Sequence, residues 1–521
     1  MKETAESRWE NLWQYRSLAL RRAIDNSSLT IPSLIPESDQ NDPLSPTWNS
    51  LPSLYQGVGA RGVNSLSAKL LLSLYPPAVP FFRLTMDASK IRDYAAQSGD
   101  DEANLISQLD QVLSSMERQM LRRLDQLQTR SAVFEALKHL LVGGNALLYI
   151  GPDFIRMYGL RSYCLQRDPE GNVTEIVVRE QVNKKFVPGA KSTDDDNVDV
   201  FTHVSVDPAE DLVTWYQEHQ GKQIKNSQGF SRLDNSPWLP LRWGRVAGEP
   251  YGRGLVEDVL NDLQALETLT QAIVEGSLVA AKAVGLVNPN GVTRADVLAK
   301  AKNGAIVAGN AADVEFLQVQ KANDFSVALQ SMQMIERRLS FSFLLNEAVQ
   351  RDAERVTAEE IRLMSEQLEV GLGGAYTVLA EELQLPLIQR VMFLMERDGE
   401  LPPVPKGLVS PQITTGLEAI GRGNDKQRLT NFLSTIATAL GPEQFLQYIN
   451  PSELIRRFAA SDGIDTAGLV RSEEEIQQGQ DQQEQAMLAQ QLTQGAIQSG
   501  ATQPPQITPN GAGPGLVPGP N

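Results

Sequence analysis

Hydrophobic residues recur at helical spacing over several long stretches of the chain. In the first part of the sequence this pattern predicts four helices, over residues 8–25, 57–75, 102–130 and 131–142. A further apolar stripe from Val256 to Val274 predicts a helix over residues 254–283. At 1.5 Å per residue that helix is about 45 Å long, which exceeds the usual length of a helix in a globular domain.

The middle of the chain changes to the alternating pattern of β-strands. Strands are expected over residues 145–150, 163–166, 173–179 and 198–206. The sequence Asp-Pro-Glu-Gly-Asn at residues 168–172 is typical of a hairpin connection between two of them. Three successive aspartates at residues 194–196 lack a metal-loop pattern and indicate a solvated turn.

A second long helix is expected over residues 325–345, so that two long helices bracket a short segment, residues 284–322. This segment begins with a Pro/Gly turn at residues 288–291. It then predicts a short helix near 294–301 and strands at 305–307 and 314–319. The pattern therefore indicates a small α/β module inserted between two long helices.

The chain after the second long helix starts with a short polar segment, residues 346–356. Thr357 and Glu360 have the spacing of a capping box and predict the start of another helix. Glycines at 371, 373 and 374 predict a kink, after which the helical pattern continues to Met395. A last helical region is expected over residues 424–460. Residues 472–521 contain no Lys or Arg and are Gln-rich, then Pro/Gly-rich, which predicts a largely disordered tail.

Composition narrows the possible functions of these 521 residues. Hydrophobic residues make up 41% of the chain, enough for real cores. The net charge of −17 argues against a protein that grips nucleic acid over its whole surface. One cysteine and three scattered histidines exclude a disulfide framework and argue against Cys/His zinc sites. No apolar run reaches the length of a membrane span, and the charged N-terminus does not resemble a secretion signal.

No catalytic motif stands out. Residues 57–62, Gly-Val-Gly-Ala-Arg-Gly, match the dinucleotide pattern G-x-G-x-x-G, but neither a preceding strand nor a following βαβ unit is evident. We interpret these glycines as sites of close packing at a helix start. P-loop, nucleophile-elbow and zinc-protease motifs are missing, and His139 and Cys164 fit buried structural positions. The sequence therefore predicts a protein that is not an enzyme and that needs no cofactor or metal.

Several segments resemble the portal (head-to-tail connector) proteins of short-tailed, podovirus-type bacteriophages. The most specific is NEAVQRDAERVTAEEIR at residues 346–362. The others lie in the same order as in that family, at residues 55–77, 134–150, 163–173, 250–293, 338–345, 379–391 and 414–423. The G-x-G-x-x-G stretch is itself part of the resemblance, which favours the packing interpretation over a nucleotide site.

The resemblance implies an α+β, mainly helical portal fold, with a wing, a two-helix stem, an inserted α/β clip and a helical crown. It also implies assembly as a ring, typically of twelve copies. The implied parts are a wing (1–251), a first stem helix (252–283), a clip (284–323), a second stem helix (324–345), a tunnel loop (346–356), a long kinked helix returning to the wing (357–410), a crown (411–471) and a tail (472–521).

The resemblance further implies a channel at one capsid vertex, through which double-stranded DNA is packaged by the large terminase and later ejected. Other implied partners are the tail adaptor and tail proteins and the major capsid and scaffolding proteins. No interaction with a membrane is implied. The protein is expected in the virion after assembly in the cytoplasm of the bacterial host. Two alternatives remain: another oligomeric virion component such as a tail adaptor, and an enzyme with a nucleotide pocket at residues 57–62.

Candidate site residues follow from this resemblance to portal proteins. Arg351 and Arg355 in the tunnel loop are expected to face DNA, although they could instead pair locally with neighbouring acids such as Asp352. Acidic residues on the first long helix, among them Glu257 and Asp262, suit either salt links between subunits or a solvated channel wall. Partner recognition by the clip is expected to use Asn288, Asn290, Arg294, Lys300 and Lys302.

Overall fold

A computed structural model describes most of the first four hundred residues of the chain. The described residues are 4–37, 51–76, 80–86, 102–187, 197–281, 284–317, 322–345, 368, 371–401, 409–413, 430–436, 438 and 454. The chain divides into two compact units, Met1–Ala419 and Ile420–Asn521. In the second unit, residues 430–436 are helical. The expected tunnel loop with Arg351 and Arg355, the capping box at Thr357 and the tail after residue 471 lie outside the described residues.

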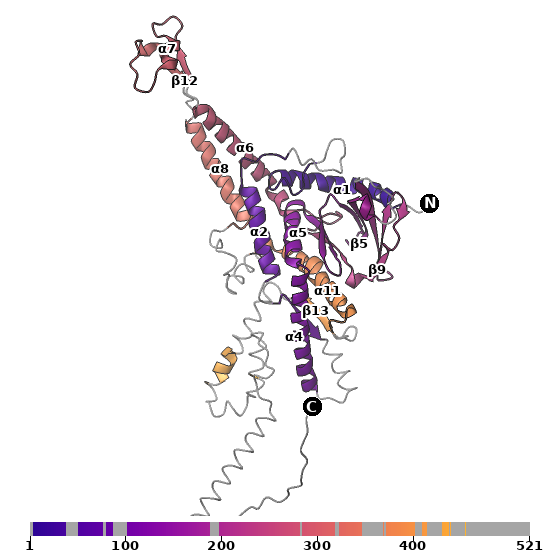
Figure 1. Cartoon of the computed structure of the whole chain (residues 1–521). Coiled ribbons are helices and arrows are strands. Elements are labelled where there is room, and N and C mark those ends of the chain that lie inside the picture. The colour runs from indigo at the N-terminus through magenta and orange to yellow at the C-terminus, as the bar shows by residue number, and fades with distance from the viewer. Residues whose placement is uncertain are drawn as a thin grey trace, which may run out of the picture. The chain divides into compact units, whose positions relative to one another are not determined.

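Four of the expected helices form near the N-terminal end of the first unit: α1 (Ala5–Ser28), α2 (Val58–Leu74), α4 (Glu102–Gln126) and α5 (Thr129–Gly143) (Figure 1). The boundary between α4 and α5 lies a few residues earlier than the pattern predicts. Gln128 adopts a left-handed conformation with φ of 53° and interrupts the helix there. The hydroxyl of Thr129 donates to the carbonyl of Leu124, which satisfies one of the carbonyls at the end of α4 that lack a partner within the helix.

The β-rich middle of the chain forms two antiparallel sheets. The smaller sheet has the order β10-β2-β3, with bounds Trp238–Arg242, Asn145–Ile150 and Ile155–Tyr158. The larger sheet has the order β4-β5-β6-β7-β8, and β9 also pairs with β7. Its strands are β4 (Tyr163–Arg167), β5 (Val173–Asn183), β6 (Asn197–Asp207), β7 (Leu212–His219), β8 (Lys222–Gln223) and β9 (Gly229–Arg232). The hairpin predicted at residues 168–172 joins β4 to β5.

Helix α1 covers one face of the larger sheet. Trp9 and Leu12 on the helix pack with Cys164, Val177 and Phe201 on three neighbouring strands. The opposite face joins the main core, which also contains α2, α5 and the smaller sheet. His139 and Cys164 are both buried, as the sequence predicts. Burial lowers the pKa of His139 to about 4 and raises the pKa of the Cys164 thiol to about 12, so neither carries a charge near neutral pH.

The last helices of the first unit return to this core. They are α10 (Gly374–Leu379), a π-helical turn (Ala380–Gln384) and α11 (Leu385–Arg397). The predicted kink is confirmed, since Gly373 has a left-handed φ of 47° just before α10. The side-chain amide of Gln384 donates to the carbonyl of Leu74, so the π turn caps the end of α2. Strand β13 (Val409–Ile413) pairs with β1 (Phe82–Met86), so the expected boundary of the crown at residue 411 falls inside a strand.

The two long helices are α6 (Leu255–Ala281) and α8 (Ala322–Ser342), with the inserted module between them (Figure 1). The inserted module, residues 284–317, contains β11 (Val284–Val287), α7 (Ala295–Lys300), a 3-10 turn (Ala311–Asp313) and β12 (Val314–Leu317). The prediction of a strand at residues 305–307 is wrong, since this segment pairs with no strand in the described structure. Among the described residues, no helix has the length and apolar character needed to cross a membrane.

Candidate functional site

Helices α6 and α8 pack directly against each other (Figure 1). Leu263 and Leu266 of α6 and Leu339 of α8 are buried in the core that the two helices share. An ion pair between Asp262 and Arg338, 2.6 Å apart, joins the helices near the main body. Asp262 therefore has a partner inside its own chain. The same holds for Glu257, which pairs with Arg253 on one side and Arg22 on the other.

Two glycines of α2 allow close packing, one against the end of α8 and one against the segment that follows α1. A Cβ placed on Gly62 would lie 2.5 Å from Cγ of Phe343, and Phe343 is fully buried. A Cβ on Gly59 would lie 2.6 Å from the carbonyl oxygen of Leu29. Gly57 is the N-cap of α2, and residues 51–56 before it contain no strand. Gly59 and Gly62 are thus sites of close packing, as the sequence predicts, whereas a Cβ on Gly57 would meet no atom within 4 Å.

The same helix contacts the chain where α8 ends. The ammonium of Lys69 donates to the carbonyl oxygen of Leu344, a residue with a left-handed φ of 52°. Burial lowers the pKa of Lys69. A cation at this position satisfies a C-terminal carbonyl and complements the helix dipole. Residues 346–356, which follow directly, include the predicted DNA-facing residues and lie outside the described structure.

An apolar stripe runs along an exposed side of α8. Val327, Met334 and Phe341 are seven residues apart, so they share one helix face, and they are 63%, 65% and 78% exposed. On helix α6, Val274 and Leu278 are four residues apart and also exposed. Large apolar side chains gathered on one exposed surface are typical of an interaction site. The prediction from sequence did not include this stripe, although its seven-residue spacing was visible in the sequence.

Polar contacts to Asp313 organise the inserted module. Its carboxylate accepts hydrogen bonds from the backbone amides of Val292 and Thr293 and from the Thr293 hydroxyl, at 2.9–3.1 Å. Asn288, one of the predicted partner-binding residues, uses its side-chain oxygen to accept from the amide of Asn290 within the turn. These two asparagines therefore shape the turn, and both remain exposed.

Three predicted partner-binding cations lie together around α7. Arg294 is the N-cap residue, Lys300 ends the helix, and Lys302 follows it. All three are exposed. Arg294 also pairs with Asp296 at 3.3 Å, and such an exposed pair contributes little stability. The structure thus brings these cations to one short segment of the surface.

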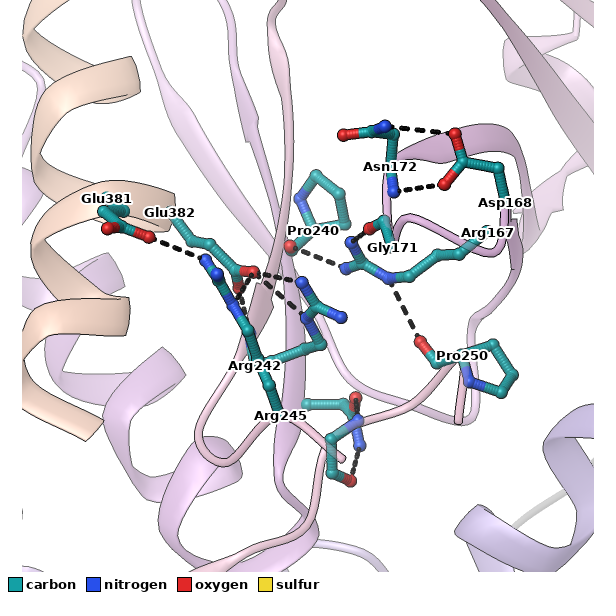
Figure 2. A network of polar contacts seen from close by, with 12 residues as sticks. Arg167, Asp168, Gly171, Asn172, Pro240, Arg242, Arg245, Pro250, Glu381 and Glu382 are labelled. Atoms are coloured by element: carbon teal, nitrogen blue, oxygen red, sulfur yellow. Dashed lines mark hydrogen bonds and ion pairs between the residues drawn. The ribbon is translucent and has the colours of Figure 1, made fainter. Parts of the chain in front are cut away.

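A polar network fastens the returning helices to the body of the chain. Figure 2 shows Glu382, in the π turn, accepting from the guanidinium groups of Arg242 and Arg245 at 2.6–3.1 Å. It also accepts from the backbone amide of Arg242, while Arg245 reaches Glu381. Beside them Arg167 donates to three carbonyls, of Gly171, Pro240 and Pro250 (Figure 2). Burial lowers the pKa of Arg167 to about 10.

No cluster of metal-ligating side chains occurs among the residues that the structure describes. The main features of the described chain are instead a helix pair with an exposed apolar stripe, a small module with exposed cations, and a body that anchors both. Exposed apolar side chains of this kind are typical of a subunit that contacts other chains.

The chain belongs to the bacteriophage head to tail connecting protein family, whose model matches residues 2–470. It is 39% identical to the portal protein of Escherichia phage T7 over 93% of this chain and 91% of that protein. It is 38% identical to the portal protein of Enterobacteria phage T3, over 95% of this chain and 92% of that protein. The portal protein of Pseudomonas phage phiKMV is 31% identical over 96% of this chain and 98% of its own length.

A solved structure, the neck of an empty GTA particle, covers 79% of this chain and 90% of its own length. The two share 12% sequence identity, with a TM-score of 0.37.

Proposed function

We propose that this chain forms the portal of a short-tailed bacteriophage, a ring-shaped channel at one vertex of the capsid. The observation that carries the proposal is family membership over nearly the whole chain, because relatives matched end to end are portal proteins. The order of helix, small module, helix in residues 255–342 supports the assignment of stem and clip. Negative-stain imaging of the purified chain tests it: rings with a central hole are expected, and a monomer would contradict it.

Ring assembly, with twelve copies as the expected number, would cover the apolar stripe on α8. Replacing Met334 and Phe341 together by Glu would place two charges in that contact, so we expect rings to dissociate into smaller species in size-exclusion chromatography. Gln333→Glu, on a different face of the same helix, is the matched control and should leave the rings intact. Equal elution of both variants with the wild type would show that the stripe is not an interface.

Double-stranded DNA would pass through the ring, driven by a separate ATPase, the large terminase, and would leave by the same route during ejection. DNA must slide, so a net acidic subunit with a few local cations suits the task better than a basic surface. We assign those cations to Arg351 and Arg355 in the tunnel loop. Replacing both by Ala should leave rings intact and reduce DNA retention in filled heads.

The control for this experiment is the double Arg→Lys variant, which keeps the positive charge and should retain DNA as the wild type does. Unchanged packaging and retention in the Ala variant would show that the two arginines do not act on DNA. If both variants lose retention equally, the arginines act through their specific local pairs and not through charge.

Partner recognition is assigned to the clip, which would meet the terminase during packaging and the tail adaptor afterwards. The exposed cations Arg294, Lys300 and Lys302 suit an acidic surface on those partners, with Asn288 and Asn290 on the adjoining turn. Replacing Lys300 and Lys302 by Glu should leave ring assembly unchanged and reduce tail attachment. Normally tailed particles from this variant would refute the assignment.

The remaining assignments follow from the same function. The wing, residues 1–251, would contact the major capsid protein and, during head assembly, the scaffolding protein. The protein would reside at a capsid vertex of the virion after assembly in the cytoplasm of the bacterial host. It would carry out no covalent chemistry itself.

A further inference from the structure

A cavity of about 260 Å³ is lined by residues of both the smaller and the larger sheet. The wall from the smaller sheet is mostly aromatic. Trp238, Tyr149 and Arg156 are neighbours across its three strands, and Tyr158 follows two residues after Arg156, so these side chains share one face. Phe154, in the turn before β3, completes the wall. Successive rings along it have centroids 4.6–6.2 Å apart, which makes one continuous aromatic surface.

The wall from the larger sheet is mainly polar. Thr202 and Gln217 are partners across β6 and β7, and the side-chain amide of Gln217 donates to the Thr202 hydroxyl at 3.4 Å. Glu180 lies on the neighbouring strand β5, with its side chain only 12% exposed. Ser227 and Trp215 complete this wall. The cavity therefore offers an aromatic surface on one side and oxygen acceptors on the other.

Glu180 is a buried carboxylate that its own chain satisfies incompletely. The hydroxyl of Tyr158 donates to Oε2 of Glu180 at 3.3 Å. Nη2 of Arg156 lies 2.7 Å from Oε1 but is not aligned for a hydrogen bond, so Oε1 has no hydrogen-bond donor among the described residues. The Arg156 side chain is 56% exposed, and its guanidinium lies 5.2 Å from the centroid of the Tyr158 ring. A better placed cation can therefore displace Arg156 from the carboxylate.

We propose that this cavity binds an arginine side chain of another polypeptide, which takes the place of Arg156 on Glu180. A guanidinium is planar, so its face stacks on the aromatic wall while its edge donates to the carboxylate and the oxygens beside it. Arg156 shows that this chemistry suits the site, since its own guanidinium already pairs with Glu180 and lies over an aromatic ring. The cavity is formed within one chain, so the inference does not depend on the proposed ring.

A polypeptide is the expected carrier of this arginine because the cavity adjoins the edge of a sheet. In the order β10-β2-β3, the outer edge of β3 pairs with no other strand in the described structure. Arg156 and Tyr158, which line the cavity, both lie on β3. An extended segment that pairs with β3 can direct one side chain into the cavity. The net charge of −17 favours the approach of such a basic segment.

Saturation-transfer NMR with the full-length chain tests the site, because this method detects weak ligands of a large protein. The probes are acetyl-Gly-Arg-Gly-amide and the same peptide with citrulline, which has the shape of arginine without its charge. We expect the citrulline peptide to bind at least about tenfold more weakly, and equal binding of the two would overturn the inference. Methylguanidinium is the third probe. If it binds as tightly as the arginine peptide, the cavity takes a small free cation and the assignment to a polypeptide is wrong.

Two variants of the cavity should change the affinity for the arginine peptide in opposite directions. Glu180→Gln should weaken binding by at least about tenfold, because it removes the charge partner of the guanidinium. Arg156→Ala should strengthen binding by about fivefold or more, because the competing internal side chain is gone. A merely structural role of Arg156 predicts no such gain. Unchanged affinity in either variant would contradict the inference.

Phe154→Ala keeps the test decisive if a buried variant fails to fold, since Phe154 is 50% exposed. This change removes part of the aromatic wall and should weaken peptide binding by about threefold. Phe186→Ala, at an exposed phenylalanine that does not line the cavity, is the matched control and should bind as the wild type does. If the two variants bind equally, the cavity is not the site and the inference falls. Ring imaging judges the portal assignment separately.

Discussion

Gly62 is the position where the packing of α2 against α8 is most sensitive to a single methyl group. A Cβ at Gly62 would lie 2.5, 2.6 and 2.9 Å from three ring atoms of Phe343, whereas ordinary contacts begin at 3.4 Å. The ring would have to move by about 1 Å, in a core where it is fully buried. Such overpacking costs about 1–3 kcal/mol, against a gain of about 1 kcal/mol in helix propensity. We expect Gly62→Ala to lower the free energy of unfolding by up to about 2 kcal/mol.

Gly374→Ala is the matched control, because a Cβ there meets no atom within 4 Å and its backbone is not left-handed. This variant should be as stable as the wild type or gain up to about 1 kcal/mol. Urea unfolding followed by tryptophan fluorescence, at one protein concentration for all variants, measures both. Hydrogen exchange of residues 337–344 should increase in Gly62→Ala alone, since the strain lies at the end of α8.

A double variant separates this clash from a general loss of stability. Phe343→Leu provides a smaller and more adaptable side chain, so Gly62→Ala should cost less in its presence than in the wild type. The coupling energy should be about 1 kcal/mol or more. If the two substitutions are additive, or if Gly62→Ala is as stable as Gly374→Ala, the proposed contact does not constrain the helix pair.

Three further predictions concern the body of the chain. Glu382→Gln should lower the free energy of unfolding by about 3 kcal/mol, because it leaves the buried guanidinium of Arg242 without its charge partner. Glu381→Gln, at an exposed pair, should lower it by less than about 1 kcal/mol in the same unfolding experiment. Burial would raise the pKa of Glu175, but hydrogen bonds from Arg8 and His203 lower it to about 2. The stability that this carboxylate contributes is therefore present above about pH 4.5 and lost as the pH falls toward 2. Glu175→Gln should flatten that part of the acid-unfolding curve. Equal acid-unfolding curves for the variant and the wild type would contradict this role of Glu175. Cys164 should resist thiol reagents at pH 8 in the folded chain and react within minutes in urea, whereas fast labelling of the folded chain would show that α1 does not cover the sheet.

Local sequence signals determined much of the element order. The long apolar stripe of α6, the hairpin at residues 168–172 and the kink before α10 are set by spacing, turn residues and glycine, all of which act within a few positions. Burial of His139 and Cys164 also followed from their neighbours in sequence. Resemblance over most of the chain pointed to the connector family, and the family model matches residues 2–470.

Tertiary structure decided what these elements do to one another. Nothing in a periodic pattern shows that Gly62 faces Phe343, or that Glu382 faces Arg242, because each pair is far apart in sequence and meets only through the fold. The failed strand at residues 305–307 has the same cause, since strand formation needs a partner edge and the propensity of the segment does not supply one. The sequence by itself therefore determined the helices, the turns and the family. Only the tertiary structure showed the packing of α2 on α8, the exposed apolar stripe on α8 and the missing interior of the inserted module, because burial depends on which surfaces meet.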